Sequence, residues 1–208
     1  MRLTDSLEEQ ALLEAILEES KPALPPAVRS LHYLLATPFR YRPHGGSRFR
    51  APFEAGVWYG AEALRTGLAE KSYWRLRFLL DSPGTPDLRA VPHTAFAAGV
   101  RTAAAVDLTR KPFARDRAVW TDRTSYGGTQ EFAAVARAAH IHVIRYESVR
   151  DPQRGACAAV LDPAAFGRGR PRGLQTWFVA ASRARVRCVP EAGGETFEFS
   201  AAQLLGEG

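Results

Sequence analysis

The first apolar pattern in the chain has the spacing of a helix. Leucine and isoleucine side chains recur four residues apart between residues 12 and 17, which places them on one face of a helix. Ser6 and Glu9 precede this pattern with the spacing of a capping box. The pattern therefore predicts an amphipathic helix over about residues 7–20.

Three further helices are predicted along the chain. Pro26 suits the first turn of a helix and Pro38 disfavours its continuation, so a second helix is expected over residues 26–35. A long helix is expected over residues 62–80, before a turn of sequence Asp-Ser-Pro-Gly, and another over residues 129–139.

Short runs rich in β-branched and aromatic residues predict strands. They cover residues 57–60, 100–108, 141–146, 156–161, 174–181, 184–189 and 196–199. Residues 39–53 mix arginine, aromatic and glycine residues without a helical period, and we expect them to form a strand and a loop that line a site. Because helices and strands do not alternate strictly, the predicted fold class is α+β, with a mixed sheet and flanking helices.

The length of 208 residues suffices for one domain with a substantial core. We expect a single domain over residues 1–208, with N-terminal helices in residues 1–37 and an α+β core that carries the site in residues 38–208.

No run approaches the ~18 apolar residues of a membrane span, and the acidic, polar start of the chain does not resemble a secretory signal. Two cysteines, Cys157 and Cys188, are too few for a disulfide framework, so a cytoplasmic location is expected.

The positive charge of the chain comes almost entirely from arginine. Lysine and arginine number 28 against 22 aspartates and glutamates, for a net charge of +6. Arginine binds phosphates through its planar fork, so the excess fits a nucleotide or nucleic-acid partner. It equally fits a genome rich in G and C, so only clustered arginines indicate a function. The arginines of residues 167–173 could contact nucleic acid, but a solvated loop is the favoured interpretation.

One such cluster lies beside a Gly-Gly pair. It comprises Arg40, Arg42, Arg48 and Arg50, around Gly45 and Gly46. Forked side chains next to free backbone N–H groups can bind a pyrophosphate. The alternative is a solvated loop and strand edge.

Glu70 is the candidate carboxylate of the long predicted helix. It shares a face with Gly67 and Trp74. Glycine inside a helix costs ~1 kcal/mol relative to alanine, and close approach of a backbone or a ligand beside Glu70 would be a reason to keep Gly67. The alternative is a surface glutamate paired with Arg77.

Two strands contribute further candidates. Trp58 and Tyr59 are neighbours on a strand and must face opposite ways, so one lies in the core and the other can stack on a ligand. Ser148 follows a strand and precedes Arg150, a position that suits a bond to a phosphate or ribose, or an ordinary turn. The five histidines lack metal-binding spacing with carboxylates, and no nucleophile elbow, phosphate-binding lysine loop, dinucleotide-binding glycine pattern or helix-turn-helix is present.

Four motifs in order resemble the RES domain family, named after its Arg, Glu and Ser signature residues. They are Gly45-Gly46-x-Arg48-Phe49, Val57-Trp58-Tyr59-Gly60-Ala61, Ala63…Thr66…Ala69-Glu70 and Tyr146-x-Ser148-Val149-Arg150. The resemblance covers about residues 39–166. It implies that Arg48, Glu70 and Ser148 are the catalytic signature residues, and that Tyr59 is the tyrosine of the strand.

The resemblance also implies how a substrate is held. Arg40 and Tyr41 resemble a pair of binding residues that precedes the Gly-Gly turn in the family, although the equivalent arginine can be Arg40 or Arg42. Tyr126 lies where the family has a tyrosine before a helix. Arg48, Tyr59 and Ser148 complete the expected binding set.

RES proteins are toxins of bacterial toxin–antitoxin pairs, so the resemblance implies a bacterial toxin with a fold similar to ADP-ribosyltransferase toxins. It implies NAD as the substrate, no metal, and an Xre-type antitoxin that covers the active site. The reaction would be NAD hydrolysis, NAD phosphorolysis or ADP-ribosyl transfer to a protein target. A module from another class, a non-enzymatic arginine-rich protein that binds nucleic acid, is the alternative; the enzyme interpretation expects no direct contact with nucleic acid.

Overall fold

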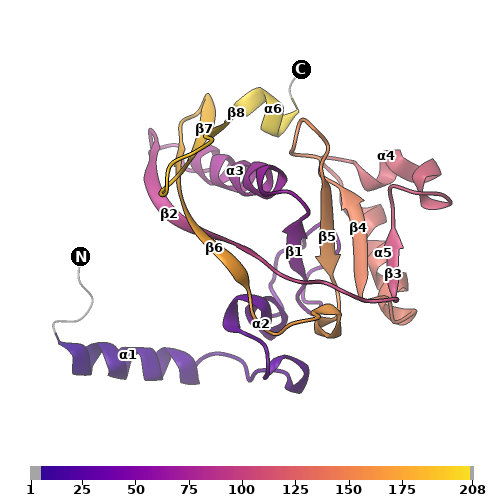
Figure 1. Cartoon of the computed structure of the whole chain (residues 1–208), viewed down its shortest axis with the longest axis horizontal. Helices are drawn as coiled ribbons and strands as arrows, with labels where there is room; N and C mark the ends of the chain where they lie inside the picture. Colours follow the sequence, from indigo (N-terminus) through magenta and orange to yellow (C-terminus); the bar gives the residue numbers. More distant parts are fainter. Residues whose placement is uncertain (1–5, 207–208) are drawn as a thin grey trace.

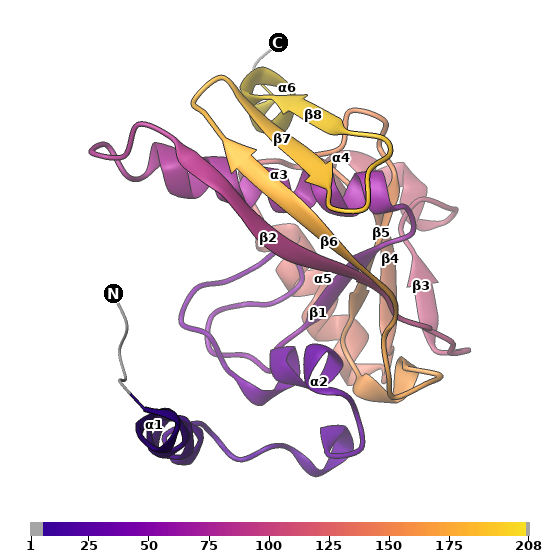
Figure 2. The same ribbon diagram turned by 60° about the vertical axis from the view of Figure 1, so that its left-hand side comes forward.

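The strands form two four-stranded sheets with helix α3 between them (Figure 1). The computed structural model describes residues 6–206 of the 208. The first sheet has the order β1 (Trp58–Ala61), β5 (Ala156–Val160), β4 (Val143–Glu147) and β3 (Ala105–Asp107). The second has the order β2 (Leu88–Ala97), β6 (Arg172–Ala181), β7 (Arg185–Pro190) and β8 (Phe197–Ser200), and crosses the front of Figure 2. The first sheet is mixed, because β3 runs parallel to β4, and the second is antiparallel throughout.

The helices are distributed along the whole chain. They are α1 (Leu7–Glu19), α2 (Tyr33–Arg40), α3 (Leu64–Leu80), α4 (Arg117–Trp120), α5 (Gly127–Ala138) and α6 (Ala201–Leu205). Single 3-10 turns cover Pro26–Val28, Phe113–Asp116 and Pro163–Ala165. The α+β class predicted from the sequence is confirmed, and the strands divide between two sheets.

The first sheet is packed on both faces. Tyr59 and Ile144 face the core shared with α5. Trp58 and Val143 face the opposite core, which contains Leu35 of α2. The predicted opposite orientation of Trp58 and Tyr59 is therefore confirmed, and it follows from the two-residue repeat of a strand.

Helix α3 joins the two sheets. Its side chains Leu68, Leu76 and Leu79 are buried against the second sheet, while the helix also contacts β1 and β5 of the first. Glu70 lies on the face of α3 that is directed toward the first sheet. Because the leucines are buried on the other side, the helical repeat determines where the Glu70 carboxylate lies.

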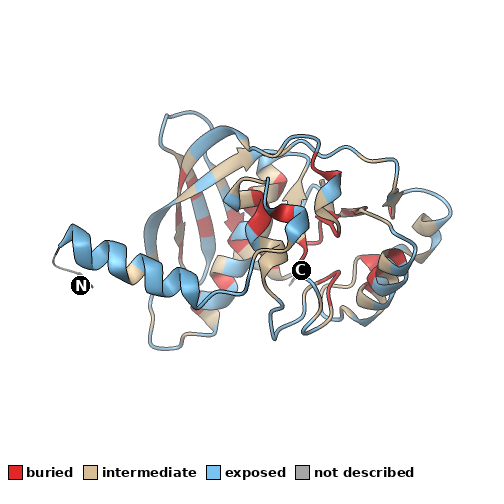
Figure 3. Ribbon diagram, turned by 90° about the horizontal axis from the view of Figure 1, so that it is seen from below, coloured by how far each residue is buried: buried red, intermediate tan, exposed pale blue. Residues whose placement is uncertain are grey.

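Helix α1 projects from the body of the protein, as Figure 3 shows. None of its residues is buried, and it is tied to α2 by the ion pair between Glu18 and Arg40. Helix α2, in contrast, is anchored through the fully buried Leu35. No helix in residues 6–206 combines the length and the apolar character needed to cross a membrane.

The second helix predicted from the sequence is wrong in its bounds. The chain forms one 3-10 turn at Pro26–Val28 and starts α2 only at Tyr33, where the His32 ring nitrogen accepts the Leu34 N–H at 3.3 Å. The helix then continues through Pro38 to Arg40. Pro38 lies two residues from the end, where its missing N–H costs a single helical hydrogen bond.

The strand predicted over residues 100–108 is also longer than the observed β3, and β2 was not predicted. Strand β2 contains Pro92 and exposes most of its side chains, so its sequence lacks the alternation of a half-buried strand. It lies at the edge of its sheet, where proline is tolerated. The strand predicted within residues 39–53 is wrong. Residues 39 and 40 end α2, and Ser47 and Arg50 form only an isolated bridge, because Pro43 and the Gly45-Gly46 pair favour turns over an extended strand. The remaining predicted helices and strands are found, with ends shifted by a few residues.

Candidate active site

A cavity of about 430 Å³ lies between α3, the first sheet and the loop that follows β4. Four of the predicted site residues line it, namely Arg48, Tyr59, Glu70 and Tyr126. They come from the Gly-Gly turn, β1, α3 and the start of α5. The fold therefore brings together groups that are far apart in the sequence.

Among residues 6–206, Glu70 offers the only carboxylate on the wall of this cavity. It is half-buried, and one carboxylate oxygen accepts a hydrogen bond of 2.6 Å from the Ser148 hydroxyl. Burial raises the pKa of Glu70, while the bond from Ser148 and the charges of Arg150 and Arg48 oppose that rise. The alternative of a surface glutamate paired with Arg77 is wrong, because Arg77 pairs with Asp81.

Ser148 uses its whole hydrogen-bonding capacity to hold Glu70. Its oxygen accepts the backbone N–H groups of Arg150 at 3.2 Å and Asp151 at 3.0 Å, and its hydrogen goes to Glu70. A hydroxyl has one donor and two acceptor positions, and all three are occupied. Ser148 therefore lies behind the carboxylate, as a residue that positions it.

Arg48 is a buried guanidinium with spare donor capacity. One terminal nitrogen donates to the Trp120 carbonyl at 3.0 Å, and the Arg48 Cζ lies 4.8 Å from the centre of the Tyr126 ring. The other terminal nitrogen, Nη2, is buried and has no hydrogen-bond partner within residues 6–206. A buried donor without a hydrogen-bond partner is costly, so Nη2 of Arg48 retains unused donor capacity.

Arg150 is a second cavity cation. Its Cζ lies 3.6 Å from the centre of the Tyr73 ring, and its Nη2 donates to the Arg123 carbonyl at 2.8 Å. Arg150 is buried and lines the same cavity as Glu70. The sequence motif contained Arg150, yet it was not predicted as a site residue; its place two residues after Ser148 was the available signal.

Tyr59 is fixed by the turn that carries Arg48. Its hydroxyl accepts the Phe49 backbone N–H at 3.0 Å and shares a hydrogen bond of 2.8 Å with the Ser47 hydroxyl. Burial raises the pKa of Tyr59, so the phenol stays neutral. These hydrogen bonds fix the orientation of the Tyr59 ring, which therefore forms a rigid aromatic part of the cavity wall.

Asp151 ties the loop after β4 to α3. This buried carboxylate accepts hydrogen bonds from the Thr66 hydroxyl at 2.8 Å and the Gln153 N–H at 3.0 Å, and it pairs with Arg65. Burial opposes ionisation, but these bonds outweigh it and lower the pKa of Asp151. The network fixes the loop that carries Ser148 against the helix that carries Glu70.

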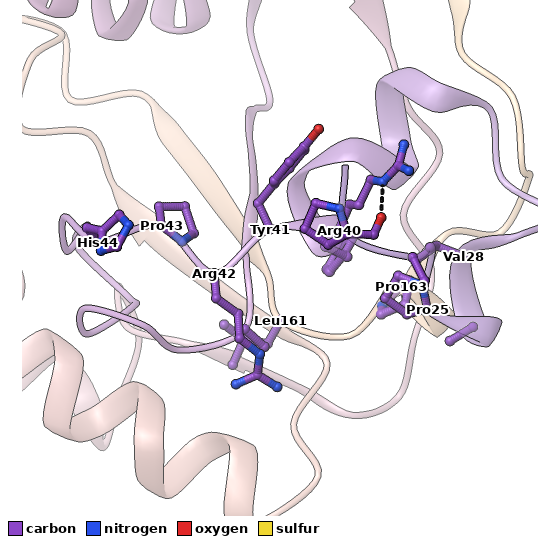
Figure 4. Close-up of a pocket in the computed structure, with 14 residues that line it drawn as sticks. Pro25, Val28, Arg40, Tyr41, Arg42, Pro43, His44, Leu161 and Pro163 are labelled. Carbon is purple, nitrogen blue, oxygen red and sulfur yellow. Dashed lines mark hydrogen bonds between the residues drawn. The ribbon is translucent and has the colours of Figure 1, made fainter. Parts of the chain in front are cut away.

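Arg40 and Tyr41 lie elsewhere, on the wall of a separate pocket of about 880 Å³ (Figure 4). The Arg40 guanidinium donates to the Pro22 carbonyl at 2.5 Å and to Glu18 of α1 at 2.6 Å. Arg42 lines that same pocket. The structure thus leaves both candidate arginines outside the Glu70 cavity, and their assignment to the substrate stays a prediction.

In the part of the chain that the structure describes, no group of three or more histidine, cysteine, aspartate or glutamate side chains could hold a metal ion. The side chains on the cavity wall offer one carboxylate, two guanidinium groups, the Lys71 ammonium group, the Cys157 thiol and several aromatic rings.

A family model described as the RES domain matches residues 24–180, which include every residue of the Glu70 cavity. A search of curated proteins finds none that matches the chain.

Proposed function

Because the chain belongs to the RES domain family, we propose that it cleaves the bond between nicotinamide and ribose in NAD. RES domains are associated with toxin–antitoxin systems and with enzymes that act on NAD. The observation that carries the proposal is the Glu70 carboxylate, held by Ser148 in a cavity that also contains Arg48 and Arg150.

The proposed chemistry follows from the charge that develops on the sugar. When the bond between C1′ and the pyridine nitrogen breaks, its electron pair goes to nicotinamide and leaves positive charge on the ribose. A fixed carboxylate in a site with little water stabilises that charge. Glu70 has this role, and the bond from Ser148 orients it and favours its ionised form against the effect of burial.

The two arginines would hold the negative end of the substrate. Arg48 has a buried Nη2 free to donate, and the guanidinium fork suits phosphate oxygens. Arg150 lies on the same wall and adds a second positive charge. With the phosphates held, the rings of Tyr59 and Tyr126 would restrict the nicotinamide riboside to a reactive orientation.

The acceptor of the ADP-ribosyl group defines the reaction type. Water gives a glycohydrolase, inorganic phosphate a phosphorylase, and a protein side chain an ADP-ribosyltransferase. In each case the acceptor oxygen or nitrogen bonds to C1′ as the bond to nicotinamide breaks. Water, a hydroxyl or an N–H group loses a proton in this step, whereas an anionic phosphate or carboxylate oxygen has none to lose. The residues of the cavity are compatible with all three acceptors.

The proposed biological role is that of a toxin in a type II toxin–antitoxin pair. Loss of NAD or modification of a target would arrest growth. An Xre-type antitoxin is the expected partner, and it would neutralise the toxin by covering the mouth of the Glu70 cavity.

The test is incubation of the purified protein with NAD, with and without inorganic phosphate, and identification of the products by mass. Release of nicotinamide by the wild-type protein, and its loss in Glu70→Gln, would support the proposal. The second product identifies the acceptor: ADP-ribose, a phosphorylated ADP-ribose or a modified protein. Equal nicotinamide release by wild type and Glu70→Gln would contradict it.

A further inference from the structure

A second hollow continues from the Glu70 cavity into the space between the two sheets. This inter-sheet groove has a volume of about 820 Å³ and is lined by β1 and α3 on one side and by β2 and β6 on the other. It shares five lining residues with the Glu70 cavity: Tyr59, Gly60, Ala61, Gly67 and Lys71. The two hollows therefore meet along β1 and the first half of α3.

Two residues of α3, one turn apart, form the junction. At Gly67 a Cβ atom would have only one neighbour within 4 Å, the Ala61 Cβ at 3.8 Å, so the missing side chain leaves open space toward a ligand. Lys71 is exposed, lines both hollows and makes no hydrogen bond or ion pair within residues 6–206. A free ammonium group thus stands where one hollow passes into the other.

The far part of the groove is aromatic. The Trp58 indole lies over Gly60, where a Cβ atom would come within 2.4 Å of the ring. The Phe96 ring from β2 lies 6.5 Å from it, centre to centre. Flat rings of this kind suit stacking with another aromatic system.

His93 of β2 adds a polar group to the same wall. Its Nε2 is buried and has no hydrogen-bond partner in the described part of the chain. Burial, together with the charges of Lys71 and Arg75, lowers the pKa of His93, so its ring is neutral at pH 7. A neutral imidazole can donate to or accept from a base or a ribose hydroxyl.

We propose that the inter-sheet groove binds the adenosine half of the dinucleotide, with Lys71 on the phosphate next to it. The inference rests on the proposed function and names the part of the substrate that the Glu70 cavity leaves out. A dinucleotide is larger than the drug-sized ligands that fill pockets of a few hundred Å³. The adenine would stack against Trp58 and Phe96, and the nicotinamide riboside would remain beside Glu70.

The test compares NAD with nicotinamide mononucleotide, which lacks the adenosine half, in Lys71→Met, Phe96→Ala and the control Arg77→Ala. Arg77 is an exposed cation of α3 that lines neither hollow. Each groove variant should raise KM for NAD about 10-fold, the equivalent of one lost stacking or phosphate contact. The kcat/KM of Phe96→Ala for nicotinamide mononucleotide, and all constants of Arg77→Ala, should stay unchanged. Because Lys71 also lines the Glu70 cavity, Lys71→Met should lose more activity against NAD than against nicotinamide mononucleotide. Equal effects on both substrates, or none, would overturn the inference.

Titration with ADP separates this inference from the proposed function. ADP carries the adenosine half but has no bond to cleave. Binding of ADP that Lys71→Met and Phe96→Ala weaken would support the groove even if NAD were not cleaved. Cleavage of NAD without such ADP binding would support the proposed function and refute the groove.

Discussion

The hydroxyl of Ser148 donates a hydrogen bond of 2.6 Å to the carboxylate of Glu70, across 78 positions of sequence. Ser148 is itself held by two backbone N–H groups of its own loop. The bond therefore connects the end of β4 to the middle of α3. It fixes the direction of the Glu70 carboxylate and favours its ionised form.

Replacement of Ser148 by alanine should reduce catalysis while binding of NAD persists. A hydrogen bond to a charged group contributes about 1.5–3 kcal/mol, so kcat should fall roughly 10- to 100-fold. Because the bond lowers the pKa of Glu70, the acid limb of the pH–rate profile should move to higher pH. Steady-state kinetics across pH measure both effects.

The control for this variant is Ser72→Ala. Ser72 is another buried serine, on α3, with its hydroxyl near the Cys188 sulfur at 3.5 Å. Its removal tests the cost of losing a buried hydroxyl away from the cavity, and the acid limb should stay in place. A Ser148→Ala profile that matches that of Ser72→Ala would contradict the positioning role.

Replacement of Glu70 by glutamine should stabilise the folded protein at neutral pH. Burial raises the pKa of Glu70 above the value of 4.5 that it has when unfolded. The folded state therefore binds more protons than the unfolded state in this window, and stability falls as pH rises through the raised pKa. The stability of Glu70→Gln relative to wild type should increase from pH 4 to pH 7, as thermal melts can measure.

Glu62→Gln serves as a comparison, because the pKa of Glu62 is shifted in the opposite direction to that of Glu70. Arg145 lowers the pKa of Glu62 by hydrogen bonding, so the ionised form stabilises the fold above pH 4.5 and that gain is lost below the lowered pKa. Since Glu62 is exposed, the effect should stay below about 1 kcal/mol. A Glu70→Gln variant that is less stable than wild type at pH 7 would show that the buried carboxylate does not strain the fold.

The α+β class and most elements could be predicted because their signals are local. Residues 64–80 have helix-forming composition and a clear stop, and the strands of the first sheet are short apolar runs. Strand β2 could not be predicted, since its stability comes from pairing with β6 rather than from its own pattern. The start of α2 depends on the hydrogen bond that the His32 ring accepts from Leu34. Histidine is not a typical helix-capping residue, so the sequence contains little indication of this start.

The site was predictable in its residue types and less so in its roles. The motifs placed Arg48, Tyr59 and Glu70 in the right order, and the structure puts them around one cavity. The contacts that set the roles are long-range. No local sequence pattern shows that the Ser148 hydroxyl donates a hydrogen bond to Glu70. Nor does one show that Arg40 forms an ion pair with Glu18.

Arg48 and Arg40 should therefore differ when each is replaced. Arg48→Lys keeps a charge but loses the fork that directs a free Nη2, so the Kd for NAD should rise roughly 10-fold or more, for a loss of about 1.5–3 kcal/mol. Arg40→Lys should leave Kd within about twofold, less than ~0.5 kcal/mol, because Arg40 lies outside the Glu70 cavity and its guanidinium is engaged by Glu18 and the Pro22 carbonyl. Titration calorimetry on Glu70→Gln, which does not consume NAD, measures both. Equal weakening would place Arg40 on the substrate, as the family resemblance suggested.

Replacement of Gly155 by alanine should destabilise the protein, because Gly155 lies against the bonds that tie the Ser148 loop to α3. A Cβ atom at Gly155 would lie 2.0 Å from the Thr66 hydroxyl oxygen and 3.0 Å from an Asp151 carboxylate oxygen. Since Thr66 donates to that same carboxylate, Gly155→Ala must displace one partner of a buried bond. We expect the free energy of unfolding to fall by roughly 1–3 kcal/mol, which lowers Tm by about 2–12 °C. We also expect kcat to fall, because the loop that positions Glu70 shifts.

The matched control is Gly84→Ala, where a Cβ atom would meet nothing within 4 Å and stability should change by less than about 0.5 kcal/mol. Equal melting temperatures for the two variants would mean that the loop adapts without cost, and that the Asp151 network does not hold Ser148 in place.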